Sequence, residues 1–210
     1  MTNYEKPDFW SLKAKKEAYP ARSVYKLKEI DEKFHFFKFV RQAELRVLDL
    51  GAAPGSWSLY VLRRHGIPGN NQKALFLTAV DLQPLSENSN FSDHKDFFFI
   101  QGDFTNSTVR EALIRRGPYN AIISDAAPLT TGSRTVDTQR SLSLAEEAFS
   151  FAENCLVPGG NLAVKVFQGG DTATLLKRLR ECFDSAKNFK PAACRSNSFE
   201  TYLLGFGKKN

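Results

Sequence analysis

The sequence has little of what builds disulfide frameworks, metal sites or membrane spans. Its cysteines are odd in number and contain no C-x-x-C pair: Cys155, Cys182 and Cys194. Neither a disulfide framework nor a zinc site is therefore expected, the three histidines show no ligand spacing, and a reducing cytoplasm is the expected location. No apolar run approaches the ~20 residues that span a bilayer. The N-terminal stretch also lacks the apolar segment of a secretory signal.

The composition excludes a disordered or fibrous chain, because 42% of the 210 residues are hydrophobic and 25% are charged. A chain of this size can bury about 70% of its unfolded surface, so its core needs no disulfide or metal. Repeats, low-complexity tracts and convincing linkers are absent. We expect one globular unit at residues 46–210, preceded by a helical appendage at residues 1–45.

The net charge of +6 is unevenly distributed along the chain. Residues 1–28 hold seven Lys/Arg and three Asp/Glu, and residues 171–210 hold eight and four, so each end carries +4. The intervening residues 29–170 hold 14 and 16, which gives −2. Any single lysine is best explained as part of a solvated helix face. The asymmetry as a whole favours a polyanionic partner, because clustered Lys and Arg bind phosphates by releasing counterions.

Short apolar runs that end in turn residues alternate with longer amphipathic stretches, a pattern typical of α/β proteins. Strands are predicted at residues 46–50, 75–80, 97–100, 121–124, 162–167, 185–189 and 201–206. Helices are predicted at residues 8–19, 22–34, 56–65, 106–116, 137–155 and 171–182. The alternation predicts a mostly parallel sheet covered on both faces. The last two strands have no helix between them, which predicts an antiparallel hairpin at its end.

Four successive predicted strands end in an aspartate, where the carboxyl ends of a parallel sheet form a ligand crevice. These are Asp49, Asp81, Asp103 and Asp125, and a glycine-rich turn at residues 51–55 follows the first of them. One such aspartate is most often a helix cap or turn former. Four in phase, beside a glycine-rich turn, favour a small-molecule site.

The turn does not match the phosphate-binding motifs, because no Gly-Lys-Ser/Thr follows it and Ala53 and Pro54 interrupt a G-x-G-x-x-G pattern. A wall of carboxylates would repel pyrophosphate, which makes a nicotinamide-dependent oxidoreductase the less favoured alternative. S-adenosylmethionine carries a sulfonium and an ammonium group and no phosphate, and suits the site better. Asp81 is placed for its ribose, Asp103 for the adenine amine, and Asp49 with the turn for the methionine end.

Residues 49–58, DLGAAPGSWS, resemble the cofactor motif of the FtsJ/RrmJ family of ribosomal RNA 2′-O-methyltransferases. The similarity covers roughly residues 9–208 in the family's order, through RSVYKL (22–27), SDAAP (124–128), PGG (158–160), VKVFQG (164–169) and RSNSFETY (195–202). It implies a Rossmann-like class I methyltransferase fold, a mostly parallel seven-stranded sheet with an antiparallel C-terminal strand. It also implies S-adenosylmethionine as cofactor, with S-adenosylhomocysteine as product. The residues expected to hold it are Asp49, Gly51, Ala52, Pro54, Gly55, Ser56, Trp57, Asp81, Leu82, Asp103, Phe104 and Asp125.

Two departures from the family pattern are visible. Ser56 stands where many members have a second glycine, which matters only if that residue needs a positive φ. Ala126 and Leu129 stand where methionine and asparagine are more usual. These replacements could alter the substrate pocket, but they remove no ionisable group.

The resemblance implies a catalytic tetrad of Lys26, Asp125, Lys165 and Glu200. The residues support this set independently. Lys165 lies inside an apolar strand, where a charge is costly unless it is paired, and Asp125 ends the strand before it. Glu200 opens the last strand, so an antiparallel pairing would bring it to the same edge. The alternatives are a lysine that snorkels out of its strand, an exposed edge carboxylate and a solvated helix lysine at position 26.

The expected reaction is in-line methyl transfer to the ribose 2′-hydroxyl of a uridine in large-subunit (23S-type) ribosomal RNA. Lys165 would orient the hydroxyl and accept or screen its proton, and alignment of the reacting atoms would supply much of the acceleration. The appendage at 1–45 would lie over the mouth of the site. Alternatives are a tRNA or mRNA-cap substrate, or a non-catalytic RNA-binding assembly factor on the same scaffold. We expect a monomer without a membrane or metal partner.

Basic residues near the N-terminus are interleaved with aromatic ones, which favours contact with RNA. The residues expected to contact it are Lys13, Lys15, Lys16, Arg22 and Arg195. Phe9 and Trp10 are expected to dock their helix onto the sheet rather than to stack on bases.

Overall fold

The computed structural model describes residues 8–39, 44–66, 74–87, 91–169, 171–195 and 198–210. The helices are α1 Phe9–Lys16, α2 Val24–Phe34, α3 Ser56–His65, α4 Ser107–Ile114, α5 Arg134–Cys155 and α6 Thr172–Cys182, with a 3-10 turn at Phe91–Asp93. The strands are β1 Glu44–Leu50, β2 Ala74–Asp81, β3 Phe97–Gln101, β4 Tyr119–Ser124, β5 Leu156–Phe167, β6 Phe183–Phe189 and β7 Glu200–Lys208. No helix in these ranges is long and apolar enough to cross a membrane.

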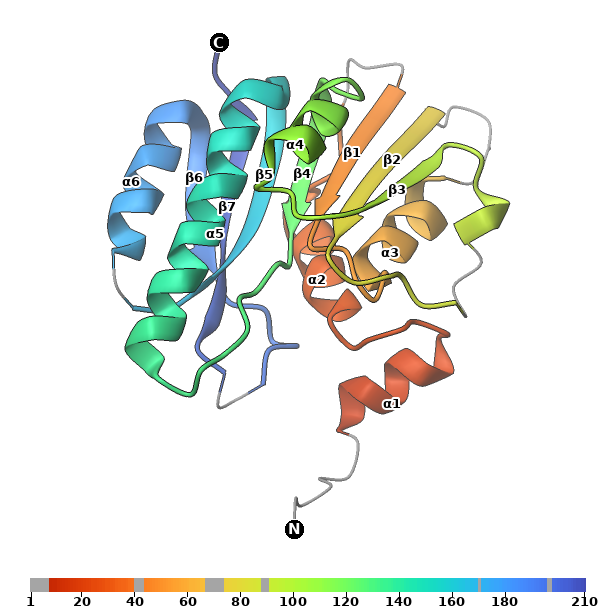
Figure 1. Cartoon of the computed structure of the whole chain (residues 1–210), viewed down its shortest axis with the longest axis horizontal. Helices are drawn as coiled ribbons and strands as arrows, with labels where there is room; N and C mark the ends of the chain where they lie inside the picture. Colours follow the sequence, from red (N-terminus) through yellow and green to blue (C-terminus); the bar gives the residue numbers. More distant parts are fainter. Residues whose placement is uncertain (1–7, 40–43, 67–73, 88–90, 170, 196–197) are drawn as a thin grey trace.

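The strands form one seven-stranded sheet in the order β3-β2-β1-β4-β5-β7-β6 (Figure 1). The pairs from β3 to β5 are parallel, whereas β7 pairs antiparallel with both β5 and β6. The predicted α/β fold, with a mostly parallel sheet and an antiparallel C-terminal strand, is therefore confirmed. Because β7 runs antiparallel to β5, its first residue, Glu200, pairs with Phe167 at the end where β5 finishes.

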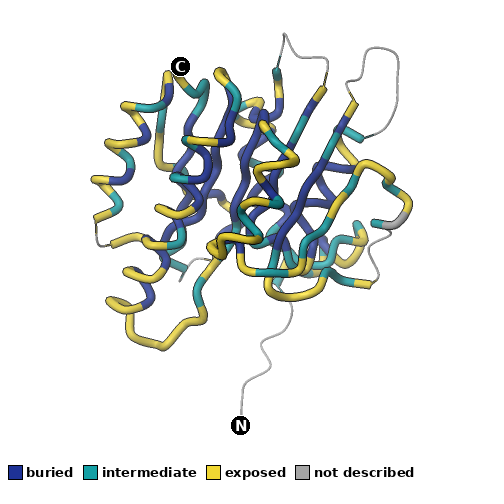
Figure 2. Tube along the Cα trace, turned by 45° about the horizontal axis from the view of Figure 1, so that its top comes forward, coloured by how far each residue is buried: buried dark blue, intermediate teal, exposed yellow. Residues whose placement is uncertain are grey.

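Helices cover both faces of the sheet, so the central strands are buried along most of their length (Figures 1 and 2). One hydrophobic cluster joins α2 and α3 to one face of the sheet. The other cluster joins α4, α5 and α6 to the opposite face. This double coverage explains why strands such as β4 read as continuous apolar runs rather than as alternating ones.

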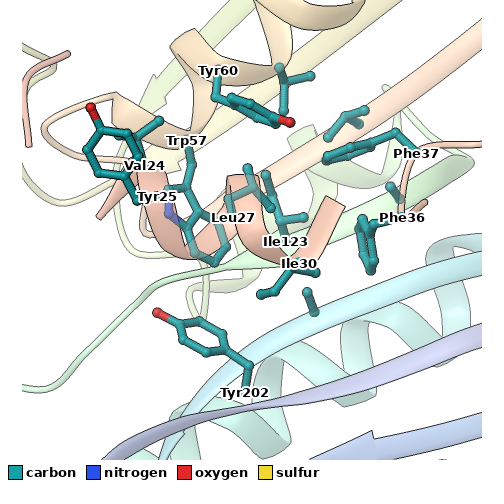
Figure 3. Packing of buried hydrophobic residues seen from close by; sticks show 14 of the residues in the cluster. Val24, Tyr25, Leu27, Ile30, Phe36, Phe37, Trp57, Tyr60, Ile123 and Tyr202 are labelled. Atoms are coloured by element: carbon teal, nitrogen blue, oxygen red, sulfur yellow. The ribbon is translucent and has the colours of Figure 1, made fainter. Parts of the chain in front are cut away.

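The second half of the N-terminal segment is packed into the core. Val24, Leu27 and Ile30 project from α2 with 0% exposure and lie near Trp57 and Ile123 (Figure 3). By contrast, α1 buries only Ala14 among its residues and lies at the lower end of the molecule in Figure 1. Residues 24–37 thus share the core of the sheet, and a domain boundary at residue 45 stays a prediction.

Two ends of the sheet matter for the sites below. The carboxyl edge is the end where the parallel strands β1 to β5 finish, and the amino edge is the end where they begin. In Figure 1, β1 and β2 run from the amino edge at the top to the carboxyl edge, and α1 lies beyond the carboxyl edge.

Candidate active site

The glycine turn, residues 51–55, leaves β1 at the carboxyl edge and has no free N–H group pointing to a ligand. The N–H groups of Gly51 and Ala52 both donate to the Val80 carbonyl, at 2.9 and 3.1 Å. The Ala53 N–H donates to Asp81 Oδ2 at 2.8 Å. The Gly55 N–H donates to the Ala52 carbonyl at 2.7 Å, and the proline between them has none. Phosphate groups need such donors, so this turn does not suit a pyrophosphate.

Gly51 is required at the start of this turn for two reasons. Its φ is +75°, which favours glycine, and a Cβ there would lie 2.6 Å from the Ala126 Cα atom. Ala126, one of the two departures from the family pattern, therefore packs directly against the turn. Leu129, the neighbouring departure, is 90% exposed and belongs to the surface.

Asp49 is a buried carboxyl group with an unused oxygen. It is 0% exposed, and its Oδ2 atom accepts a 2.7 Å hydrogen bond from the Ser58 hydroxyl. Within the described residues, its Oδ1 atom has no hydrogen-bond partner. Burial, together with the charges of Asp125 and Asp81, raises the pKa of Asp49 to about 7, although the hydrogen bonds from Ser58 lower it. A cation next to Oδ1 would remove this penalty.

The other predicted cofactor residues line the same edge. Asp81 Oδ1 accepts from the Gln83 N–H at 2.8 Å, so both oxygens of this carboxylate are oriented by backbone donors. Asp103 Oδ1 accepts from the N–H and the hydroxyl of Thr105, each at 2.8 Å. Leu82 is 63% exposed beside Asp81, whereas Phe104 is 7% exposed and belongs to the core.

Ser56 and Trp57 face the N-terminal segment with their side chains. Ser56 begins α3 and is not among the residues with positive φ, so serine in place of glycine causes no backbone strain. Its hydroxyl accepts a 2.7 Å hydrogen bond from the Ala21 N–H. The Trp57 indole N–H donates to the Ser23 carbonyl at 2.9 Å. These side chains are therefore committed to the protein, and a cofactor would meet the backbone of this turn of helix.

The four residues of the predicted tetrad lie together, although they come from four separate segments of the chain. Lys165 Nζ lies 2.9 Å from Asp125 Oδ1, and it also donates to the Asp125 carbonyl. Lys26 Nζ lies 2.8 Å from Glu200 Oε1. The four side chains are between 8 and 15% exposed. The Lys165 ammonium is thus held beside acids in a nearly buried position and does not project into bulk water.

Sheet geometry explains this convergence. Side chains alternate between the two faces of a strand, and Lys165 shares a face with Ala163, which packs in the α2 cluster. The antiparallel register pairs Lys165 with Tyr202 and Phe167 with Glu200. Glu200 therefore reaches the carboxyl edge on the face that α2 covers.

The electrostatics of the site favour the charged forms of Asp125 and Lys26. Burial opposes ionisation of Asp125, but the charges of Lys165 and Lys26 and a hydrogen bond from Tyr202 outweigh it and hold its pKa below the usual value. Burial likewise opposes the charged form of Lys26, but Asp125 and Glu200 outweigh it and raise its pKa. Two cations and two anions therefore balance each other inside the site.

Tyr202 is a member of this site that the sequence reasoning missed. Its hydroxyl donates to Asp125 Oδ1 at 2.7 Å, and its ring centroid lies 5.7 Å from that of Trp57 (Figure 3). The Lys26 ammonium lies 6.0 Å from the same ring centroid. Its position two residues after Glu200 in a strand places both on one face, which is the signal that would have found it.

A hollow of about 410 Å³ opens beside Lys26 and Glu200, and is called the tetrad hollow below. Arg22 and Arg195 line it together with Ser198. Arg22 is held in place by the Ala193 carbonyl, to which it donates at 2.6 Å, and by an ion pair with Asp8. Burial and the charge of Arg195 lower the pKa of Arg22. The volume of the tetrad hollow falls in the range of small-molecule sites, and the guanidinium groups of Arg22 and Arg195 favour an anionic ligand there.

The three lysines of α1 are farther from the tetrad. Lys15 and Lys16 are exposed, whereas the Lys13 ammonium lies 4.9 Å from the Tyr25 ring centroid. Trp10 packs against the Tyr25 ring of α2, so this contact docks α1 onto α2, whereas docking onto the sheet was expected. The same expectation was wrong for Phe9, which is 68% exposed.

Solved structures with the same fold define the class of protein. A crystal structure named as a ribosomal RNA methyltransferase, from Plasmodium falciparum, is similar with a TM-score of 0.73 and 26% identity, over 90% of this chain and 98% of that one. The fibrillarin/Nop5p complex shares the fold with a TM-score of 0.59 and 13% identity, over 88% of this chain and 82% of that one. The chain is a Rossmann-like methyltransferase.

The chain belongs to the FtsJ-like methyltransferase family, whose model matches residues 19–208. Among its curated relatives, a protein of Treponema denticola is 50% identical over 98% of this chain and 97% of its own length. A protein of Nitratidesulfovibrio vulgaris is 45% identical over 95% of this chain and 94% of its own. Both are named ribosomal RNA large subunit methyltransferase E. The family resemblance inferred from the sequence motifs is confirmed.

Proposed function

We propose that the chain transfers the methyl group of S-adenosylmethionine to the ribose 2′-hydroxyl of a uridine in large-subunit ribosomal RNA. The observation that carries this proposal is the buried tetrad of Lys26, Asp125, Lys165 and Glu200 at the carboxyl edge. The names of the two relatives, which match almost the whole chain in both directions, support the choice of RNA.

The residues at the carboxyl edge fit S-adenosylmethionine. The unused, buried Oδ1 atom of Asp49 suits the cationic methionine end. The glycine turn uses its N–H groups internally, so it offers no donors for phosphate. The start of α3 follows this turn and would favour the carboxylate of the methionine end. Asp81 would accept from the ribose hydroxyls, Asp103 from the adenine amine, and the exposed Leu82 would cover the adenine.

When bound, the cofactor supplies a methyl group that is activated by the adjacent sulfonium. The protein has to present a hydroxyl whose own pKa is far too high for ionisation at neutral pH. As an ammonium, Lys165 would hold the 2′-oxygen and screen its developing charge as the new bond to carbon forms; only after releasing its own proton to solvent, as the neutral amine, would it accept the hydroxyl proton. Asp125 fixes the Lys165 ammonium, and Tyr202 in turn fixes Asp125. Lys26 and Glu200 would orient the ribose from the other side of the group.

The acceptor nucleotide would enter through the tetrad hollow, which opens on Lys26 and Glu200. Arg22 and Arg195 would bind the phosphates that flank the target ribose, with Lys13, Lys15 and Lys16 on α1 extending the basic surface. A single-stranded or looped nucleotide fits this arrangement, because bases in a duplex cannot be brought to a closed site. Of the predicted cover at residues 1–45, the part that the structure describes before α2, residues 8–23, would lie at the mouth of the site. We further propose that the enzyme acts as a cytoplasmic monomer.

Transfer of labelled methyl groups from S-adenosylmethionine to isolated large subunits, whole ribosomes and tRNA tests the proposal, when followed by nucleoside analysis. We expect label in 2′-O-methyluridine of the large-subunit RNA. Label in tRNA alone would identify tRNA, one of the alternative substrates, as the acceptor. Cofactor binding without transfer to any RNA would favour a non-catalytic assembly factor.

A further inference from the structure

A second hollow, of about 430 Å³, lies at the amino edge of the sheet and is called the amino-edge hollow. It lies where β1, β2 and β3 begin, whereas the tetrad lies at the carboxyl edge, beyond which α1 is found in Figure 1. Segments far apart in sequence line it, and the side chains that matter are Arg46, Phe76, Lys95, Phe98, Arg115 and Arg116.

The lining is strongly cationic. Four basic side chains contribute to it, against a single carboxylate from Asp96. Arg46 is paired with Glu44 at 3.0 Å, and Arg115 lies 3.9 Å from Glu111 in an exposed pair. Within the part of the chain that the structure describes, Lys95 and Arg116 have no carboxylate within ion-pair distance. Positive charge is therefore in excess here.

Two of the guanidinium groups lie over aromatic rings. The Arg116 Cζ atom lies 3.1 Å from the Phe98 ring centroid, and the Arg46 Cζ atom lies 4.6 Å from the Phe76 ring centroid. Arg46 donates to Glu44 and to the Arg116 carbonyl, so Arg116 is the guanidinium that is left to bond a tetrahedral anion, held in place by the Phe98 ring at little entropic cost. Phosphate oxygens are the acceptors that best match this fork.

We infer that the amino-edge hollow binds backbone phosphates of the RNA substrate, away from the nucleotide that is methylated. This inference rests on the proposed function, which makes a long RNA the substrate. β1 spans seven residues between the two edges, about 20 Å, so RNA that reaches both hollows extends well beyond the acceptor loop. A protein partner would need an apolar centre in its interface, whereas the hollow has charged and aromatic walls, which suit RNA.

Two exposed side chains allow a test that spares the fold. Lys95→Gln combined with Arg115→Gln removes two charges from the hollow without uncovering a buried partner. The matched control is Lys177→Gln combined with Arg180→Gln, which removes two exposed charges from α6. Binding of protein-free large-subunit RNA transcript is measured over a range of salt concentrations, together with methyl transfer to intact subunits.

The slope of log affinity against log salt falls by about 0.7 for each phosphate of single-stranded RNA that the protein no longer neutralises. We therefore expect the Lys95/Arg115 variant to bind about 25-fold more weakly at 0.1 M salt, with a slope smaller by about 1.4. The control should change affinity less than about twofold. Substrate KM should rise in parallel with the fall in affinity.

Three results would overturn the inference: an unchanged affinity and slope, an equal weakening in the control, or weaker binding of intact subunits with unchanged binding of protein-free RNA. The last would identify an acidic ribosomal protein as the partner. Failure of the proposed function is distinguishable from all three, because the wild-type chain would then transfer no methyl group to large-subunit RNA.

Discussion

Replacing Lys165 by methionine removes one charge from the centre of the site while keeping a side chain of similar length. The Lys165 side chain is 8% exposed and its Nζ atom lies 2.9 Å from Asp125 Oδ1. The substitution therefore leaves a nearly buried carboxylate without its nearest cation. Lys26 and the Tyr202 hydroxyl still face that carboxylate, so its stabilisation is only partly removed.

The magnitudes follow from this geometry. Breaking a buried ion pair costs about 3–5 kcal/mol. Because Asp125 keeps its other partners, we expect a loss of stability at the lower end of this range, ~3 kcal/mol. For a chain of 210 residues this corresponds to a fall in Tm of roughly 6–12 °C. Loss of a positioned proton acceptor lowers kcat by about 10²–10⁴. Affinity for S-adenosylmethionine should change little, because most of the groups proposed to bind it follow β1, β2 and β3, and Asp125 alone among them pairs with Lys165.

Single-turnover methyl transfer to large subunits, calorimetric titration with the cofactor and thermal denaturation check these values. Lys165→Arg separates two roles of the lysine: it keeps the charge, but a guanidinium cannot accept a proton at neutral pH. We expect Lys165→Arg to restore thermal stability but not methyl transfer. Turnover within tenfold of wild type for Lys165→Arg would refute proton acceptance, and near-normal turnover of Lys165→Met would refute the whole assignment.

Three further outcomes can be measured. Burial raises the pKa of Asp49 to about 7, and only the carboxylate form attracts a cation. Affinity for S-adenosylmethionine should therefore rise about tenfold from pH 6 to pH 8. A calorimetric affinity that changes with pH no more than that of Asp49→Asn would contradict this. Gly51→Ala should lower the free energy of unfolding by about 3 kcal/mol in thermal denaturation, because it adds a clash with Ala126 to the strain of a positive φ. The control Gly159→Ala, at a residue with a similar φ and open space around it, should lower it by about 1–2 kcal/mol. Equal losses in the two variants would argue against the clash. Arg195→Gln should weaken RNA binding about fivefold at 0.1 M salt, and an unchanged salt slope would remove Arg195 from the RNA surface.

Much of the fold could be predicted because each element carries its own local signal. The apolar runs of β1, β2 and β4 end in turn residues, and the helices between them are amphipathic. Lys165 could be singled out for a similar reason, since one charge in an apolar strand needs a partner. Glu200 required one further step, the antiparallel direction of the last strand, which followed from the missing helix before it.

The contributions that depend on tertiary proximity could not be predicted. Counting charges along the chain placed the positive excess at the two ends, yet Arg46, Lys95 and Arg116 from the net-negative middle meet in one hollow. Arg22 shows the opposite case, a cation that its position in the basic N-terminal segment suggests to be unpaired. The fold instead anchors it to Asp8 and to the Ala193 carbonyl.

The start of α3 links the cofactor turn to the catalytic group. Ser56 and Trp57 directly follow the glycine turn, and they bond the backbone of Ala21 and Ser23, one turn before Lys26. A glycine at position 56 would leave the Ala21 N–H without this acceptor, so the serine has a structural function here that the family's more usual residue cannot supply. Ser56 and Trp57 therefore join the glycine turn to the segment that leads into α2, from whose first turn Lys26 reaches Glu200.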